Sequence, residues 1–338
     1  MTITSFQLIG DDQTLNNAHE VRFIQDVLLN GCAYQLKSHE PQLFKKTVVY
    51  LELFNPDYQW LRTLRAQGKK IVLIHMGDEF AKKDVSAYSD CDLVMRSYFF
   101  TEMFNLPDLK DKMLWIPNGY KSGVGPRAPQ QLLSVEHRTQ FAAFLGWIHN
   151  PDSFNRERDS FAQVVREIRK NPGERYMRFE RWFNRKRFAN QERRSFASVA
   201  LKSEDLYLLS SSGFSAGKNV GLYSTMLENT IFAPCPAGNS PETIRLYDVL
   251  ESGAIPISLD HEFLRSPLAL GAVGRVPFPI LNQWEELPNF LSTMKKRLME
   301  NPMEILTLQQ NCIEWWTSYK AFITKKIESK LISLSTMP

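Results

Sequence analysis

The sequence predicts an α/β protein: two Rossmann-like domains that face each other across a cleft, followed by a long C-terminal helix. Three observations support this fold class. Short apolar runs alternate with segments of helical periodicity, as in proteins built on parallel sheets. The alternation stops at residues 121–136, which are rich in Gly, Pro and Gln, and then starts again. A helical pattern runs from Pro302 to about Leu334.

We expect the chain to divide into three parts. Residues 1–136 form an N-terminal domain, residues 137–310 a C-terminal domain, and residues 311–338 a helix that packs back on the N-terminal domain. The length of 338 residues agrees with two domains of roughly 150 residues each. The net charge of +4 permits an anionic ligand but does not require nucleic acid.

In the N-terminal domain, strands are predicted where aliphatic residues run together, and helices where apolar residues recur at helical spacing. The predicted strands are residues 47–53, 69–76, 92–97 and 113–117. The predicted helices are residues 19–29, residues 55–68, which end at a glycine, and a helical stretch within 97–105.

The same rules apply to the C-terminal domain. Its predicted strands are residues 139–148, 205–209, 230–233 and 255–257. Its predicted helices are residues 156–170, 174–200, 221–227 and 288–299, together with one inside the stretch described next.

Residues 230–259 form one strand–loop–helix–strand unit. The loop begins at the Pro-Cys-Pro-Ala-Gly segment 234–238, which cannot continue a strand. Asn239 or Ser240 is expected to cap the helix, with Pro241 in its first turn and Gly253 at its end. Ligands of open parallel sheets bind in loops of this kind, at the carboxyl ends of strands.

Several protein classes find no support in the sequence. The four cysteines are far apart and form no CxxC pair, so zinc and thiol-redox sites are not expected and the thiols are taken as reduced. The N-terminus has no basic segment followed by an apolar run, as a signal peptide would have. No window approaches the ~18 apolar residues of a membrane span. We therefore expect a cytoplasmic protein.

Two longer motifs and several short ones resemble those of a known family. The longer ones are residues 223–238 (YSTMLENTIFAPCPAG) and 243–257 (TIRLYDVLESGAIPI). The short ones are VLIHMGDE at 72–79, VMRSYF at 94–99, IPNGY at 116–120, and FLG at 144–146 with Arg156 and Arg158 downstream. On these residues, 45–260 is similar to the exostosin-type glycosyltransferases and the related ribitol xylosyltransferase group. Thr243 stands where Ser is usual, and Asp248 where a longer Glu is usual.

The resemblance implies a glycosyltransferase of the GT-B fold. Such an enzyme moves a sugar from a nucleotide-sugar, here a UDP-sugar, to a glycan or glycolipid acceptor in surface polysaccharide or glycan synthesis. It implies inversion at the anomeric carbon, with no metal and no cofactor.

The C-terminal domain is expected to bind the donor. Backbone N–H groups at a helix N-terminus, helped by a cation, stabilise the charge of a departing diphosphate. Arg245 and Lys218 are the candidate cations, and the resemblance implies that Asp248 binds the ribose of the nucleotide. The donor-binding candidates together are Gly217, Lys218, Gly238, Ser240, Glu242, Thr243, Arg245 and Asp248. The alternative is that Arg245 and Asp248 only cap or pair on an exposed helix.

The N-terminal domain is expected to supply the base that takes the proton of the acceptor hydroxyl. Asp78 and Glu79 follow the clearest strand, and His75 lies just before them. The alternative is that Asp78 caps a helix and His75 packs within its strand. Arg96 binds donor phosphate or an acidic acceptor, or pairs with Asp78 or Glu79. Other candidates for donor or acceptor contact are Asn118, Gly146 and Arg156.

Residues 175–194 interleave Arg and Lys with Tyr, Phe and Trp. They form a groove for an anionic acceptor, a contact with an anionic membrane surface, a nucleic-acid site, or a solvated helix with inward aromatics. Nucleic acid is the least favoured. Two rival functions follow: a non-catalytic protein that binds sugar-nucleotides or glycans, and a protein that binds anionic surfaces or nucleic acid. Trp315 and Trp316 either stack on sugar or belong to the core.

Overall fold

The computed structural model describes most of the chain. The described residues are 7–10, 18–30, 33–36, 47–52, 58–79, 81, 85–121, 123–147, 191–211 and 220–336. All structural statements below concern these residues. The predicted helix 156–170 and most of the basic stretch 175–194 lie outside them.

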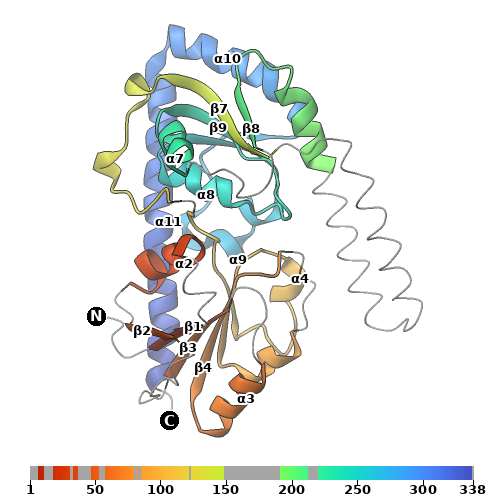
Figure 1. The fold of residues 1–338 in the computed structure, drawn as a ribbon, viewed down its shortest axis with the longest axis vertical. Coiled ribbons are helices and arrows are strands. Elements are labelled where there is room, and N and C mark those ends of the chain that lie inside the picture. The colour runs from red at the N-terminus through yellow and green to blue at the C-terminus, as the bar shows by residue number, and fades with distance from the viewer. Residues whose placement is uncertain are drawn as a thin grey trace, which may run out of the picture.

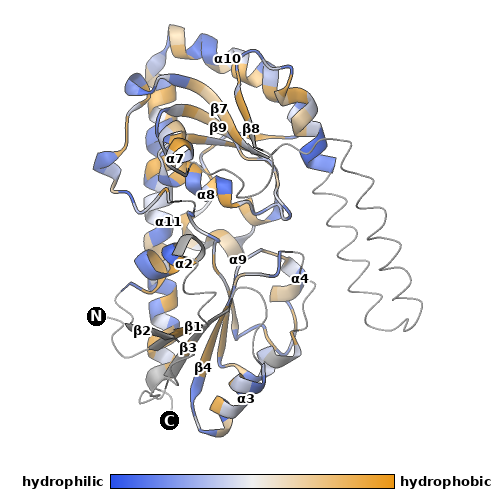
Figure 2. Ribbon diagram, in the orientation of Figure 1, coloured by the Kyte–Doolittle hydropathy of each residue, from blue (hydrophilic) through white to orange (hydrophobic). Residues whose placement is uncertain are grey.

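The N-terminal domain is built on a parallel sheet with the strand order β2-β1-β3-β4-β5-β6. Its strands are β1 Gln7–Gly10, β2 Ala33–Leu36, β3 Thr47–Glu52, β4 Lys70–His75, β5 Leu93–Arg96 and β6 Met113–Trp115. The register sets His75 beside Arg96, so the carboxyl ends of β4 and β5 meet at one edge. Figure 2 shows the apolar character of β4, which is buried from Ile71 onward.

The helices of this domain are α2 Ala18–Phe23, which continues as a π-helix Ile24–Leu28, α3 Tyr58–Ala66 and α4 Thr101–Phe104. The first lies where the sequence predicts it, at residues 19–29, whereas α4 is shorter than predicted. α3 buries Leu61 and Leu64 and is followed by a turn at Gly68, whose φ of 72° favours glycine. The predicted helical stretch 97–105 is helical only over α4, because Phe99 and Phe100 are extended or non-helical.

The C-terminal domain has a second parallel sheet, with the order β11-β10-β9-β7-β8. Its strands are β7 Gln140–Trp147, β8 Tyr207–Ser211, β9 Thr230–Pro234, β10 Ile255–Leu259 and β11 Ile280–Leu281. Its helices are α7 Val220–Glu228, α8 Ile244–Glu251, α9 Pro267–Leu270 and α10 Leu287–Glu300, and residues 191–200 are also helical.

The start of α8 corrects one prediction. The N-cap is Thr243, not Asn239 or Ser240, and Pro241 lies before the helix rather than in its first turn. Residues 239–242 bend instead, and the N–H of Gly238 donates to the carbonyl of Ser240. The end of the helix is as predicted, with Gly253 at a φ of 70°.

The long helix α11, Pro302–Thr336, runs along both domains (Figure 1). Trp316 is buried, and its ring stacks on Phe23 of the N-terminal domain with centroids 5.9 Å apart. The Thr324 hydroxyl donates to the Val27 carbonyl, and the Tyr319 hydroxyl donates to the Ala269 carbonyl of the C-terminal domain. Trp316 therefore belongs to the core. The two parallel sheets and this helix confirm the predicted fold class.

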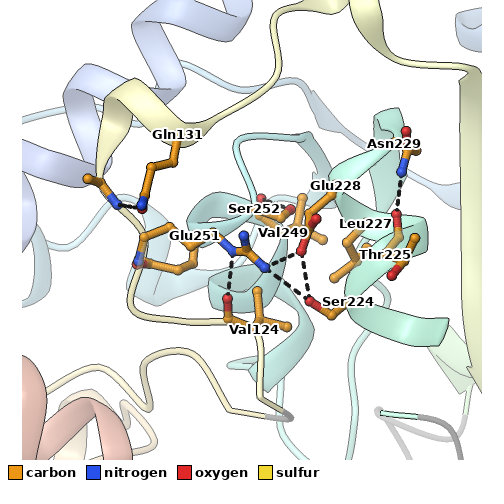
Figure 3. A network of polar contacts seen from close by, with 12 residues as sticks. Val124, Gln131, Ser224, Thr225, Leu227, Glu228, Asn229, Val249, Glu251 and Ser252 are labelled. Carbon is orange, nitrogen blue, oxygen red and sulfur yellow. Dashed lines mark hydrogen bonds and ion pairs between the residues drawn. The ribbon is translucent and has the colours of Figure 1, made fainter. Parts of the chain in front are cut away.

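The predicted linker connects the two sheets and is held at several points, although residues 128–131 are exposed. The guanidinium of Arg127 donates to the Val124 carbonyl, the Ser224 hydroxyl and the Glu228 carboxylate (Figure 3). The amide of Gln309 on α11 accepts from the N–H of Val135. The segment is therefore a fixed part of the domain interface.

Within the described residues, no helix combines the length and the apolar character needed to cross a bilayer.

We expect Trp316→Ala to lower the free energy of unfolding by about 3–5 kcal/mol, because it leaves a cavity where both domains meet α11. Urea denaturation followed by fluorescence or circular dichroism measures this. Ser318→Ala, at an exposed site on the same helix, is the control and should change stability by less than about 0.5 kcal/mol. Equal effects of the two variants would contradict the proposed role of Trp316.

Candidate active site

The candidate site lies at the switch point of the C-terminal sheet, where the strand order reverses between β7 and β9. Gly146 is near the carboxyl end of β7, and a Cβ added to it would lie 2.2 Å from Nη2 of Arg245 on α8. The Arg245 guanidinium packs over the ring of Phe144, 4.2 Å from its centroid. The structure thus brings together Gly146 and Arg245, two predicted site residues nearly 100 positions apart in the sequence.

Arg245 has no hydrogen bond or ion pair with any described residue, although the charge of Asp248 acts on it. Its other ring contact is Tyr223, 5.6 Å from the centroid. A half-buried guanidinium held by aromatic rings, with no hydrogen-bond acceptor among the described residues, is suited to an anionic ligand.

The loop between β9 and α8 is fixed from two sides within its own domain. The Glu192 carboxylate accepts from the N–H of Ala237 at 2.8 Å, and the Arg193 guanidinium donates to the Ala237 carbonyl at 3.1 Å. Arg193 also donates to Oδ1 of Asn239 and lies against Gly238. These two residues end the basic stretch 175–194, so the described part of that stretch contacts the loop.

The N-terminal domain reaches the same loop through Glu79. The amide of Asn239 donates to Oε2 of Glu79 at 2.6 Å, and the Tyr98 hydroxyl donates to Oε1 at 3.1 Å. Tyr98 has a φ of 59°, a backbone conformation that is unusual for a tyrosine and is found at functional sites. The predicted acceptor-side carboxylate therefore lies beside the predicted donor loop.

Asp78 has a different environment, which corrects its predicted role. Its carboxylate is buried and pairs with Arg96 at 2.9 Å. Arg96 also donates to the Tyr88 hydroxyl at 2.8 Å, and His75 bonds to the same hydroxyl. Asp78, His75 and Arg96 thus form a buried cluster, and of the alternatives for Arg96 the structure shows pairing with Asp78.

Glu242 lies across the domain interface, not at the donor side of the helix as predicted. One carboxylate oxygen accepts from the N–H of Asn118 and the Tyr247 hydroxyl, and the other accepts from the N–H of Phe99 and the Trp115 indole, at 2.9–3.1 Å. Burial raises the pKa of Glu242, and these four donors oppose that shift. The carboxylate ties α8 to the N-terminal domain.

Two carboxylates of α8 itself hold the connecting segment. Asp248 accepts from the N–H of Lys121 at 2.7 Å and from the Tyr223 hydroxyl at 3.1 Å. Glu251 accepts from the N–H of Arg127 at 2.7 Å. Both oxygens of the fully buried Asp248 are therefore occupied, which speaks against the predicted contact with a ribose hydroxyl. Burial raises the pKa of Asp248 to about 7.

The remaining predicted residues fall into two groups. Ser240 and Asn118 are buried, and Thr243 caps α8 without a hydrogen bond from its side chain. Gly217, Lys218 and Arg156 lie outside the described residues.

Sequence reasoning missed four side chains at this site: Glu192, Arg193, Tyr98 and Asn239 as a contact of Glu79. It also missed His261, which lies two residues after β10 and 3.5 Å from Glu192. The position of His261 after a strand was an available signal. The others are recognisable only from their partners in space.

Elsewhere, a pocket of about 370 Å³ lies at the opposite, amino end of β7, where Gln140, Tyr207 and Lys295 line it. It is therefore separate from the candidate site. Among the described residues, no group of three or more His, Cys, Asp or Glu side chains is placed to hold a metal ion.

The two parallel sheets agree with the predicted GT-B fold. Residues 214–334 match the family model described as the RXYLT1 C-terminal domain. This match covers β9, α8 and most of α11, and it confirms the predicted resemblance to the ribitol xylosyltransferase group. No curated protein matches the chain.

Two solved structures are similar over most of the chain. One, described as trehalose-6-phosphate from E. coli bound with UDP-2-fluoro glucose, has 10% identity and a TM-score of 0.44, covering 88% of this chain and 75% of that one. A UDP-forming α,α-trehalose-phosphate synthase from Burkholderia xenovorans has 8% identity and a TM-score of 0.46, covering 99% and 100%. Both TM-scores lie below 0.5, so we infer nothing further from these structures.

We expect Asp248→Asn to change how stability depends on pH. In the unfolded chain Asp248 ionises near pH 4, whereas the folded protein keeps it protonated to about pH 7. Between these values the folded state binds the extra proton, so stability falls as pH rises and then levels off above about pH 7. Asn stays neutral, so the variant should lack this fall, which is worth about 1.4 kcal/mol per unit of pKa difference.

Urea denaturation of both proteins at about pH 5 and about pH 8 measures the effect. Parallel stability curves for the two proteins would show that the carboxyl of Asp248 is not shifted by burial.

Proposed function

We propose that this protein transfers a sugar from a nucleotide-sugar to an acceptor. The observation that carries the proposal is Arg245, whose guanidinium lies at the switch point against Gly146 and makes no hydrogen bond or ion pair with any described residue. Anionic ligands of open α/β sheets bind at switch points. The family matched by residues 214–334 supports the same activity.

The leaving group of this reaction is a nucleoside diphosphate. Its negative charge grows as the glycosidic bond to the donor breaks, and fixed donors placed there lower the barrier. Arg245 and the N-terminal N–H groups of α8 supply such donors from one short element. With this charge compensation the reaction does not require a metal, and we propose a UDP-sugar as donor.

The acceptor base in this proposal is Glu79. It is only partly buried, and its two hydrogen bonds come from the neutral groups of Tyr98 and Asn239. Asp78 is less suited, because its carboxylate is buried and pairs with Arg96 inside the domain. Attack by an acceptor hydroxyl from the Glu79 side, opposite the leaving group held by α8, inverts the anomeric carbon.

The acceptor is a glycan or glycolipid in our proposal, and the pathway is surface polysaccharide or glycan synthesis. Arg193, at the end of the basic stretch, supports an anionic acceptor, because its guanidinium lies beside the loop 237–239. A membrane contact of residues 175–190 and a cytoplasmic location stay predictions.

The test is a screen of nucleotide-sugars for thermal shift and for release of the nucleoside diphosphate. We expect one donor to raise the Tm and to be turned over once a suitable acceptor sugar is added. A thermal shift without turnover by any acceptor would favour a non-catalytic binding protein. No response to any donor, together with salt-dependent binding to anionic vesicles or DNA, would overturn the proposal.

We expect Arg245→Ala to abolish the donor-induced thermal shift and to lower kcat/KM about 100-fold or more, because the diphosphate loses its cation. Gly146→Ala should act in the same direction, since the added Cβ would displace the guanidinium. Arg62→Ala is the matched control: this exposed arginine pairs with Asp90 on the N-terminal domain. A donor response unchanged in Arg245→Ala would place the diphosphate elsewhere.

We expect Glu79→Gln to lower kcat by about 100-fold or more while the donor affinity stays near that of the wild type, because only proton removal is lost. Steady-state kinetics and donor titration separate the two quantities. A matched loss of donor affinity would mean that Glu79 acts by holding the loop through Asn239.

A further inference from the structure

Two buried side chains at the domain interface have polar atoms with no hydrogen-bond partner in the described part of the chain. Asn118 is 0% exposed, and neither Oδ1 nor Nδ2 is bonded; Ser240 is 2% exposed, and its Oγ is not bonded. The neighbouring carboxylates, in contrast, are hydrogen-bonded: Glu242 accepts four hydrogen bonds and Asp248 accepts two. The unpartnered groups are thus a local feature of an otherwise well-satisfied interface.

Such groups lower stability. A buried polar atom without a hydrogen bond destabilises the folded protein relative to one that is satisfied, and Asn118 has two such atoms. A leucine at position 118 has the same branched shape and no polar side-chain atom, so it would avoid this cost. Buried groups of this kind persist where a ligand uses them.

The two side chains come from different domains but flank one contact. Asn118 follows β6, and its backbone N–H donates to Glu242 at 2.9 Å. Ser240 lies two residues before Glu242, in the loop after β9 that leads to Arg245. Both therefore stand at carboxyl ends of parallel strands, the edge at which ligands of such sheets bind.

The chemistry of these groups selects the ligand. An amide offers donors and an acceptor together, and a hydroxyl offers both as well. A phosphate only accepts, so it would leave Oδ1 of Asn118 unbonded, and it would also lie beside the Glu242 carboxylate. A sugar hydroxyl donates and accepts, which matches both side chains.

We propose that Asn118 and Ser240 bind hydroxyl groups of the transferred sugar and so determine which sugar is used. This inference rests on the proposed function and adds the recognition of the sugar to it. Because Asn118 is enclosed between the domains, the sugar reaches it while they are apart and is held when they close.

The test compares Asn118→Leu with the wild type, using the accepted donor and a series of donor analogues that each lack one hydroxyl. The wild type should reject one analogue by about 100-fold or more in kcat/KM, since a site built for a hydroxyl is left unbonded without it. Asn118→Leu should lose most of that rejection and turn over the natural donor about 10-fold or more slowly. Ser240→Ala should relax selectivity at the same or a neighbouring hydroxyl.

Thermal stability gives a second readout. Asn118→Leu should raise the Tm of the ligand-free protein, because it removes an unpartnered amide and keeps the branched shape of the side chain. The control is Asn229→Leu at the amino end of β9, where the amide donates to the Thr225 carbonyl at 2.8 Å (Figure 3). That variant should lower the Tm and leave the selectivity unchanged.

Three results would overturn the inference. One is a fall in Tm for Asn118→Leu as large as that for the control, and another is unchanged selectivity among donor analogues. The third is a change of selectivity only among deoxygenated acceptors, which would assign the site to the acceptor sugar. If the wild type transfers no sugar at all, the proposed function fails, and the inference fails with it.

Discussion

The arrangement of the two domains depends on carboxylates of one short unit that accept backbone N–H groups from the other domain. Glu242 accepts from Asn118, Asp248 from Lys121, and Glu251 from Arg127. The partners follow each other along the chain in the same order as the carboxylates, so α8 is aligned along the segment that leaves β6. Hydrogen bonds to a charged or buried carboxylate are among the stronger ones in proteins, and leaving such a carboxylate unbonded is costly. This constraint fixes α8 against both domains.

The same helix carries Arg245, and this links ligand binding to the domain arrangement. A ligand that binds the guanidinium contacts a helix that also carries Asp248 and Glu251, whose carboxylates are bonded to the segment leaving β6. Any rotation of the domains must therefore move α8 with one of them and break bonds to the other. Glu79 and Asn239 add a contact at the loop, so the acceptor side and the donor loop meet only when the domains are close. In the proposed reaction, closure of the domains would assemble the site from both halves and exclude water during transfer.

The sequence predicted the elements well where local patterns determine them. The alternation of apolar runs and helical spacing located both parallel sheets and α11, and Gly253 marked the end of α8. The sequence did not predict the contacts of Glu242 and Asp248, because a carboxylate in a helix or just before it can face either a ligand or a backbone N–H group. Here the backbone partners lie 124 and 127 residues away. The predicted start of α8 was wrong for the same reason. The Glu242 side chain turns to the N-terminal domain, and the residues before it form a bend instead of the first turn of the helix.

Adjacent positions can have opposite roles when the environment differs, and Asp78 and Glu79 show this. Asp78 turns into the domain, where Arg96 neutralises it and the pair, once buried, is costly to break. Glu79 turns outward to Tyr98 and Asn239, which are neutral donors. A base must be able to exchange its hydrogen bonds for a proton from the substrate, and neutral partners at an exposed edge allow this, whereas an enclosed guanidinium does not. Because the carboxyl ends of β4 and β5 meet at one edge, Arg96 holds Asp78 in place, and the next residue is directed toward the donor loop.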